Sequence, residues 1–204
     1  MTAVKSILRV LHRPTDEYEE IKYRRTWNVW AACIVLAAWF AVTIADRQLT
    51  GFIFNRNNLK ELNVLFLFAS TVVLFCLYTA INWAVTTLLE GKGTLKEIFC
   101  ASAYALIPTI LCTGLSVAVS RMLIMEERAF LMVIQAVGLL WSAWLLLSAL
   151  KVIHDYSLTK TVMSLLLTVF GMLFVVFLAV LFFSLLQQVW SFVRSIYNEL
   201  LYRR

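Results

Sequence analysis

Residues 161–187 read TVMSLLLTVFGMLFVVFLAVLFFSLLQ, a stretch of 27 positions without a Lys, Arg, Asp, Glu or His. A hydrocarbon core about 30 Å thick needs about 20 apolar residues of helix to cross it. Backbone groups inside lipid must bond to one another, which restricts such a stretch to helix. The stretch therefore predicts a transmembrane helix, and at about 40 Å it is long enough to tilt or protrude.

Four further stretches without ionisable side chains occupy residues 27–45, 62–89, 98–120 and 129–150. Of the 204 residues, 62% are hydrophobic and 15% are charged, so little polypeptide remains for a separate soluble domain. We therefore expect an all-α fold, a polytopic membrane helix bundle with five transmembrane helices and an amphipathic helix at each terminus.

Three parts are predicted along the chain: a cytoplasmic amphipathic segment over residues 1–25, a five-helix transmembrane domain over 26–187, and an exoplasmic amphipathic tail over 188–204. Apolar residues at helical spacing over 3–13 suit a helix that lies on the inner leaflet or packs against the bundle. Pro14 interrupts this helix, and Asp16 with Glu19 predicts the N-terminal cap of a second helix over 17–25.

The distribution of Lys and Arg predicts the orientation. With the N-terminus inside, ten of the 18 basic residues lie on the inner side and eight on the outer side, and a basic cluster directly precedes the first span. We expect the N-terminus in the cytoplasm and the C-terminus outside. The net charge of +6 is then explained by topology and attraction to lipid headgroups, not by binding of nucleic acid.

Few polar side chains lie inside the predicted spans. Asn82 and Gln135 are expected to form hydrogen bonds between helices. Pro108 lies in the middle of the third span and predicts a kink, because it removes one backbone hydrogen bond. Gly114, further along the same span, is expected to let two helices approach closely.

Groups typical of catalysis or metal binding are missing from the spans, so we expect no enzymatic activity, no cofactor and no metal. The cysteines form no C-x-x-C pair and are expected to be small buried apolar residues: Cys33, Cys76, Cys100 and Cys112. The segment Gly-Lys-Gly-Thr at 91–94 lacks the spacing of a phosphate-binding loop. Instead, Thr94 and Glu97 predict a capping box at the start of a helix.

Three segments on the predicted inner side carry the candidate contacts with a partner: the turn over 91–97, the loop over 151–160 and the N-terminal helix. The candidate residues are Gly91, Lys92, Gly93, Lys96, Lys151, His154, Asp155 and Lys160. His154 and Asp155 are adjacent, so on a helix end their side chains point in different directions. A histidine at a helix C-terminus is also favoured by the helix dipole. A structural or docking role is therefore expected for this pair in preference to catalysis.

Several motifs occur in a recognisable order along most of the chain: LHRPTDEY at 11–18, GFIFN at 51–55, NW at 82–83, EGKGT at 90–94, YALIP at 104–108, and LKVIH at 150–154 followed by Lys160. Together they resemble the Yip domain family, the Ypt-interacting proteins and their bacterial relatives. The resemblance implies five transmembrane helices, a cytosolic N-terminus and an exoplasmic C-terminus.

Eukaryotic members of that family are non-enzymatic adaptors that engage prenylated Rab GTPases and shape Golgi or ER membranes. This chain does not contain their Asp-Leu-Tyr-Gly-Pro signature or long N-terminal region, so the resemblance favours a bacterial member in the plasma membrane. Some bacterial relatives resemble companions of ABC transporter systems. The resemblance thus implies an adaptor, scaffold or accessory subunit of another membrane assembly, with an ABC-type solute transporter as the expected partner.

Two alternatives remain open. The chain could be a small transporter or channel for a neutral or lipidic solute, with a cavity near Asn82. In a eukaryote it could be a Rab-linked trafficking factor of the Golgi or ER membrane. The expected partners are membrane lipids and another integral membrane protein or transporter complex, or a second copy of the chain, without nucleic acid.

Overall fold

The computed structural model describes residues 9–11, 13–55 and 62–202. This part of the chain is helical, contains no strand, and has five helical segments long and apolar enough to cross a membrane. These segments are Val29–Leu49, Val64–Leu88, Leu95–Val119, Met125–His154 and Leu158–Glu199. The predicted all-α, five-span architecture is confirmed.

The helical elements follow the predicted spans closely, with two spans divided by local irregularities. Their bounds are α2 (Pro14–Arg24), α3 (Val29–Leu49), α4 (Val64–Phe68), the π-helical turn η1 (Ala69–Val73), α5 (Leu74–Leu88), α6 (Leu95–Ala105), α7 (Ile107–Val119), the 3-10 turn η2 (Met125–Glu127), α8 (Arg128–His154) and α9 (Leu158–Tyr202).

Local chemistry explains where the third span begins and where it bends. The Thr94 hydroxyl accepts the Glu97 N–H, and the Glu97 carboxylate accepts the Thr94 N–H at 2.8 Å, so the predicted capping box is present. The span is divided at Leu106, between α6 and α7. Pro108 has no N–H to donate to the carbonyl of Tyr104, which accounts for the break.

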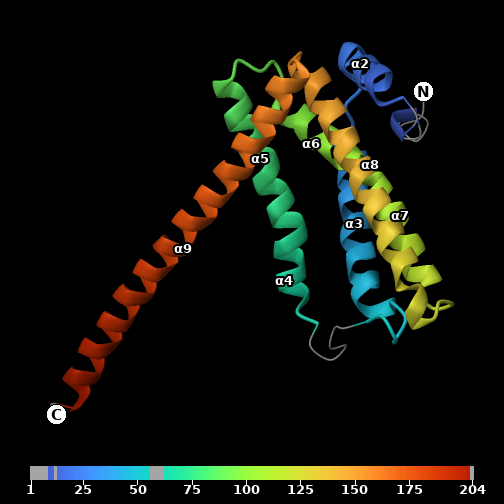
Figure 1. The fold of residues 1–204 in the computed structure, drawn as a ribbon. Helices are drawn as coiled ribbons and strands as arrows, with labels where there is room; N and C mark the ends of the chain where they lie inside the picture. Colours follow the sequence, from blue (N-terminus) through green and yellow to red (C-terminus); the bar gives the residue numbers. More distant parts are fainter. Residues whose placement is uncertain (1–8, 12, 56–61, 203–204) are drawn as a thin grey trace.

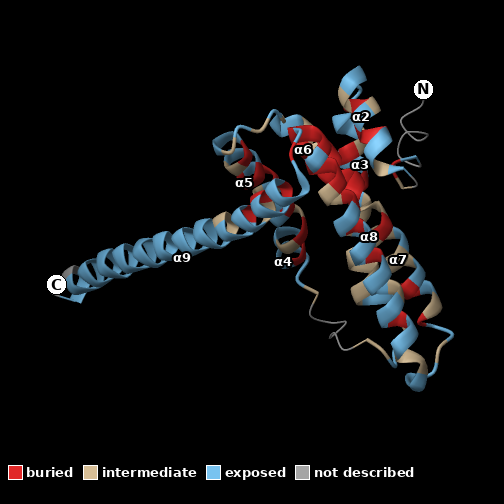
Figure 2. Cartoon of the chain, turned by 45° about the horizontal axis from the view of Figure 1, so that its top comes forward, coloured by how far each residue is buried: buried red, intermediate tan, exposed pale blue. Residues whose placement is uncertain are grey.

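The bundle consists of three spans side by side and two that join it mainly at one end (Figure 1). α6 and α7, the two halves of one span, pack along α3 and α8, and α2 lies across one end against α8. α5 contacts α6 and the first turns of α9, and α9 then diverges from the other helices. Figure 2 shows that the buried residues concentrate at the end that carries α2.

Small side chains of α6 form the centre of this buried region. Ala101, Ala103 and Ala105 are buried in one cluster with Tyr18 of α2 and Val35 of α3. Small residues at helix contacts let backbones approach closely, and within a membrane such packing is a main source of helix association. The α2 end is therefore the best-packed part of the molecule.

The terminal segments agree with the predictions in part. Residues 3–8 and 12 of the predicted amphipathic helix over 3–13 lie outside the described residues, but Val10 is fully buried in the core, which favours packing against the bundle. α2 begins at Pro14, so the predicted cap at Asp16 is wrong. Proline suits the first helical position because its φ is preset and its missing N–H needs no partner there. At the other terminus, α9 continues through residue 187 as one helix to Tyr202.

Two predictions about small residues are corrected. No atom lies within 4 Å of a Cβ built at Gly114, so this glycine does not bring two helices together. Gly138 does so instead, because a Cβ there would lie 2.6 Å from the Cβ of Cys112. Of the cysteines, Cys100 is buried as expected, whereas Cys33 and Cys76 are exposed on helix surfaces.

Candidate functional site

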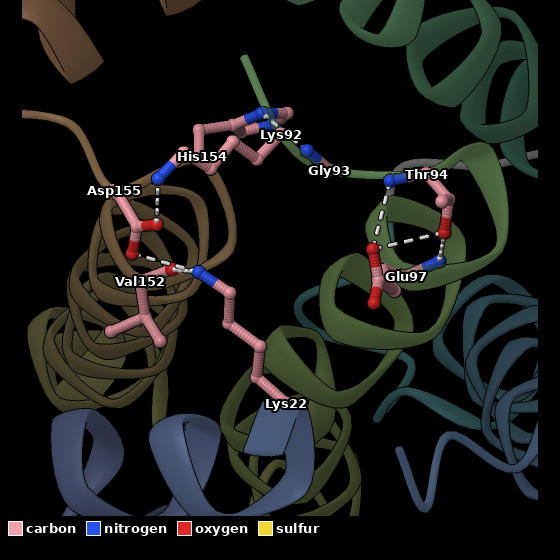
Figure 3. Close-up of polar contacts among 8 residues, drawn as sticks. All are labelled: Lys22, Lys92, Gly93, Thr94, Glu97, Val152, His154 and Asp155. Atoms are coloured by element: carbon pink, nitrogen blue, oxygen red, sulfur yellow. Dashed lines mark hydrogen bonds and ion pairs between the residues drawn. The ribbon is translucent and has the colours of Figure 1, made fainter.

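Three segments far apart in the sequence meet at the α2 end of the bundle (Figure 3). Lys22 of α2 places its Nζ 2.7 Å from the Asp155 Oδ1, and Lys92 places its Nζ 3.1 Å from the Asp155 Oδ2. Lys22 also donates to the carbonyl of Val152 at 2.7 Å. We call Lys22, residues 91–93 and residues 154–156 the loop cluster.

The end of α8 positions the central carboxylate of the loop cluster. α8 ends at His154, and Asp155 adopts a left-handed conformation with φ 54° and ψ 40°. Aspartate is among the few residues other than glycine that enter this region readily. The ammonium of Lys22 lies at the C-terminus of α8, where the helix dipole favours a cation. The two lysine hydrogen bonds, that of Lys22 first, hold the pKa of the Asp155 carboxyl below its ordinary value.

The glycines at 91 and 93 allow the loop after α5 to touch two aromatic rings. The rings of His154 and Tyr156 stack with centroids 5.2 Å apart. A Cβ at Gly91 would lie 2.7 Å from the Tyr156 hydroxyl, and one at Gly93 would lie 2.6 Å from the His154 Cε1. The Gly93 N–H donates to the His154 Nδ1 at 3.2 Å, so this nitrogen carries no proton.

Tyr156 connects the loop cluster to the end of α5 by hydrogen bonds. Its buried hydroxyl lies 3.2 Å from the carbonyl of Thr86 and 3.0 Å from that of Leu89, at the C-terminus of α5. Burial, with a smaller contribution from Glu90, raises the pKa of Tyr156, so its hydroxyl stays protonated and able to donate. The Nζ of Lys160 lies 4.5 Å from the centroid of the Tyr156 ring, within the range of a cation–π contact.

Most of the predicted contact residues come together here. The residues brought into the loop cluster or against it are Gly91, Lys92, Gly93, His154, Asp155 and Lys160. Lys96 is exposed on the first turn of α6, and Lys151 is exposed on the last turn of α8. The sequence prediction included the loop over 151–160, which contains Tyr156, and the N-terminal helix, but it did not name Lys22 or Tyr156 among the contact residues. No local pattern shows that Lys22 of α2 reaches the end of α8.

A groove of about 760 Å³ lies beside the loop cluster, between α2 and the end of α8. We call it the α2 groove; it is lined by Asp16, Glu19, Glu20, Lys22, Tyr23, Lys151, Val152, Asp155 and Tyr156. Lys22 pairs with Asp155, and Glu20 pairs with Arg24 at 3.0 Å. The groove therefore has a polar wall at the end of α8, which carries Lys151 and Asp155, and a mainly acidic wall on α2.

The chain matches the family described as the Yip1 domain over residues 8–191. The chain belongs to the Yip1 domain family. Neither the curated proteins nor the solved structures include a significant match to it. The α2 groove and the loop cluster both lie within the matched residues of the Yip1 domain.

Inside the spans of this Yip1 domain, the two predicted polar residues bond across helices. The Nδ2 of buried Asn82 in α5 donates to the Thr168 hydroxyl of α9 at 3.0 Å. The Nε2 of Gln135 in α8 donates to the Ser116 hydroxyl of α7 at 3.3 Å. Both side chains thus hold helices together, and neither lines a cavity next to the helix break at Leu106.

In the described ranges 9–11, 13–55 and 62–202, His, Cys, Asp and Glu form no group of three or more that could hold a metal ion. The cysteines in these ranges are all free thiols.

Proposed function

We propose that this Yip1 domain protein is a non-enzymatic adaptor or accessory subunit that binds another integral membrane protein through the α2 groove. The observation that carries the proposal is the groove itself, about 760 Å³ in volume and built between α2 and α8. The loop cluster holds its walls in place, because Lys22 ties α2 directly to Asp155 and Val152. Such a preformed surface can bind a partner without first having to become ordered.

The charges of the groove suggest the chemistry of the partner. In the described part of the chain, Asp16 and Glu19 take part in no ion pair, whereas Glu20, Lys22 and Asp155 do. Lys151, which also lines the groove, takes part in no ion pair in that part of the chain either, so the unpaired lining has two carboxylates against one cation. An excess of carboxylates favours a segment rich in Lys or Arg. Basic residues flank the spans of many membrane proteins, so the partner's juxtamembrane segment is the expected ligand.

The partner class and the membrane follow from the family resemblance and the charge distribution. We propose an ABC-type solute transporter as the partner, in a bacterial plasma membrane, with the N-terminus and the α2 groove on the cytoplasmic side. Tyr23 in the groove and Phe52 at the opposite end of the bundle are 92% and 91% exposed. Because the two side chains are equally exposed at opposite ends of the bundle, they are a matched pair of positions for testing the orientation of the chain in the membrane.

The orientation test uses Tyr23→Cys and Phe52→Cys with a membrane-impermeant maleimide, relative to the unmodified chain. In intact spheroplasts only the Phe52→Cys variant should gain label, and the Tyr23→Cys variant should gain it after permeabilisation. Label on Tyr23→Cys in intact spheroplasts would overturn the proposed orientation.

The function is tested by purifying the tagged full chain from its native membrane in mild detergent, with quantitative mass spectrometry. Asp16→Lys with Glu19→Lys should remove a stoichiometric membrane partner. The control, Glu126→Lys with Glu199→Lys, makes the same charge change at exposed positions outside the groove and should retain that partner. Recovery of the chain alone, or of the partner with both double variants, would contradict the proposal.

A further inference from the structure

A smaller pocket, of about 210 Å³, lies at the end of the bundle opposite α2, among α3, the loop after it, α7 and α8. We call it the distal pocket. α3 runs away from α2 and ends at Leu49, and α8 begins at Arg128 and returns to α2 (Figure 1). Asp46 and Arg128 both line the pocket. The pocket is therefore at the end of these two spans, where helices leave the hydrocarbon core and lipid headgroups lie.

The distal pocket is lined by two opposite charges that do not pair with each other. The Asp46 carboxylate has one hydrogen bond within the described residues, from the Thr50 hydroxyl at 3.3 Å, and no ion pair there. The Arg128 guanidinium takes part in no ion pair in the same ranges. A negative and a positive group thus border one space, and each can still bind a ligand group of the opposite charge.

These charges select the class of ligand. A carboxylate accepts hydrogen bonds from an ammonium, and a guanidinium binds a phosphate through two parallel hydrogen bonds. A purely anionic ligand would meet the Asp46 carboxylate, and a purely cationic one would meet the Arg128 guanidinium. A ligand with one group of each sign satisfies both. The pocket holds roughly the volume of seven water molecules at about 30 Å³ each, which suits a headgroup-sized ligand.

The other lining residues indicate which kind of ammonium fits. A quaternary ammonium has no N–H to donate and is held by a cage of aromatic rings. Phe54 is the one aromatic residue among the described residues that line the distal pocket. Gln135 also lines it, and its Nε2 donates to the Ser116 hydroxyl at 3.3 Å, which leaves its Oε1 as an acceptor. The lining therefore favours a primary ammonium, which can donate to Asp46 and to Gln135.

The surface beside the distal pocket favours a lipid over a soluble ligand. Met132 lines the pocket and is 54% exposed. Leu139 lies two helical turns further along α8, on the same face, and is 65% exposed. This apolar face runs from the pocket toward the middle of the membrane, so the acyl chains of a lipid can lie along it.

We propose that the distal pocket binds the headgroup of a phospholipid that has a phosphate and a primary ammonium, that is, a phosphoethanolamine headgroup. Asp46 accepts from the ammonium, Arg128 donates to the phosphate, and the acyl chains contact the exposed face of α8. This site is separate from the α2 groove and does not depend on the proposed adaptor function.

The test uses the full chain purified in detergent and an equimolar mixture of dioleoyl-phosphatidylethanolamine and dioleoyl-phosphatidylcholine. Native mass spectrometry counts the bound lipids. The two lipids differ only in the methyl groups on nitrogen, so their ratio reports the ammonium site. The wild type should favour the ethanolamine lipid about tenfold, because only its ammonium donates charge-assisted hydrogen bonds.

Two variants separate the roles of the charges. Asp46→Asn should bring the ratio close to one and leave the choline lipid bound as in the wild type, which also shows that the variant is folded. Arg128→Gln should reduce the binding of both lipids, because both have the phosphate. The controls Glu199→Gln and Arg194→Gln make the same charge changes at exposed positions of α9 and should change neither quantity.

Soluble O-phosphoethanolamine in large excess distinguishes the lipid from a free zwitterion. It should not displace the ethanolamine lipid, because it has no acyl chains to contact α8. Displacement would assign the distal pocket to a soluble ligand and overturn the lipid assignment. Equal binding of the two lipids by the wild type, or an unchanged ratio in Asp46→Asn, would overturn the proposed site.

Discussion

Asp155 accepts hydrogen bonds from Lys22 of α2 and Lys92 of the loop after α5, at 2.7 Å and 3.1 Å. The side chains of Lys22 and Asp155 are 29% and 52% exposed, so water screens their attraction. The value of this contact therefore lies in placing α2 against α8 more than in stability. A second hydrogen bond from Lys22 to the Val152 carbonyl adds to that placement.

The coupling between Lys22 and Asp155 can be measured with a double-mutant cycle of the two alanine variants. We expect a coupling of at most about 1 kcal/mol in the free energy of unfolding. This free energy is measured by SDS titration in mixed micelles. The pKa of Asp155 lies below its ordinary value of 3.8, so the coupling should be fully present above that pH. It should be lost as the pH falls through the lowered pKa. A coupling that grows on acidification would contradict this assignment.

Gly91 and Gly93 predict a second effect at the residue scale. Gly93→Ala places a methyl group against His154 and Ile153, and Gly91→Ala places one against Tyr156. Each should destabilise the protein by about 1–3 kcal/mol, since a packed site cannot take the extra volume without a shift. Gly114→Ala is the control, because open space surrounds it. Equal stability of all three variants in the same SDS titration would show that the loop does not pack as described.

At the scale of elements, the sequence predicted what local chemistry determines. The five spans, the break caused by Pro108 and the capping box of Thr94 and Glu97 all follow from neighbouring residues. The contact of Lys22 with Asp155 joins positions 133 apart in the chain, and no periodicity encodes it.

The contact between α9 and α5 can be tested by changing one hydroxyl group, that of Thr168. Thr161, Ser164 and Thr168 are fully buried on one face of α9, and Thr168 accepts the Asn82 amide of α5. Thr168→Val keeps the shape but leaves that amide without its partner. We expect a loss of about 0.6–2 kcal/mol in SDS titration.

Thr159→Val, at an exposed position on the first turn of α9, makes the same change without a buried partner. It should have no measurable effect on the unfolding free energy. If both valine variants behaved alike, the hydrogen bond between Asn82 and Thr168 would not hold α9 to α5.

At the scale of the whole molecule, the α2 end of the bundle and the long helix α9 present different surfaces. The α2 end contains the tight core, the loop cluster and the α2 groove, whereas α9 is exposed along most of its length (Figure 2). Exposed apolar residues on spans are compatible with contact with lipid. A charged groove beside a tightly packed core is compatible with contact with a protein. The proposed adaptor function assigns these two surfaces to different partners.

The most direct test of the α2 groove as a docking surface is photo-crosslinking in the native membrane, with a photoreactive phenylalanine at position 23 or at position 52. Tyr23 lines the groove and Phe52 is equally exposed at the opposite end. We predict one discrete adduct with another membrane protein from position 23 and none from position 52. The same adducts from both positions, or none from position 23, would contradict the account.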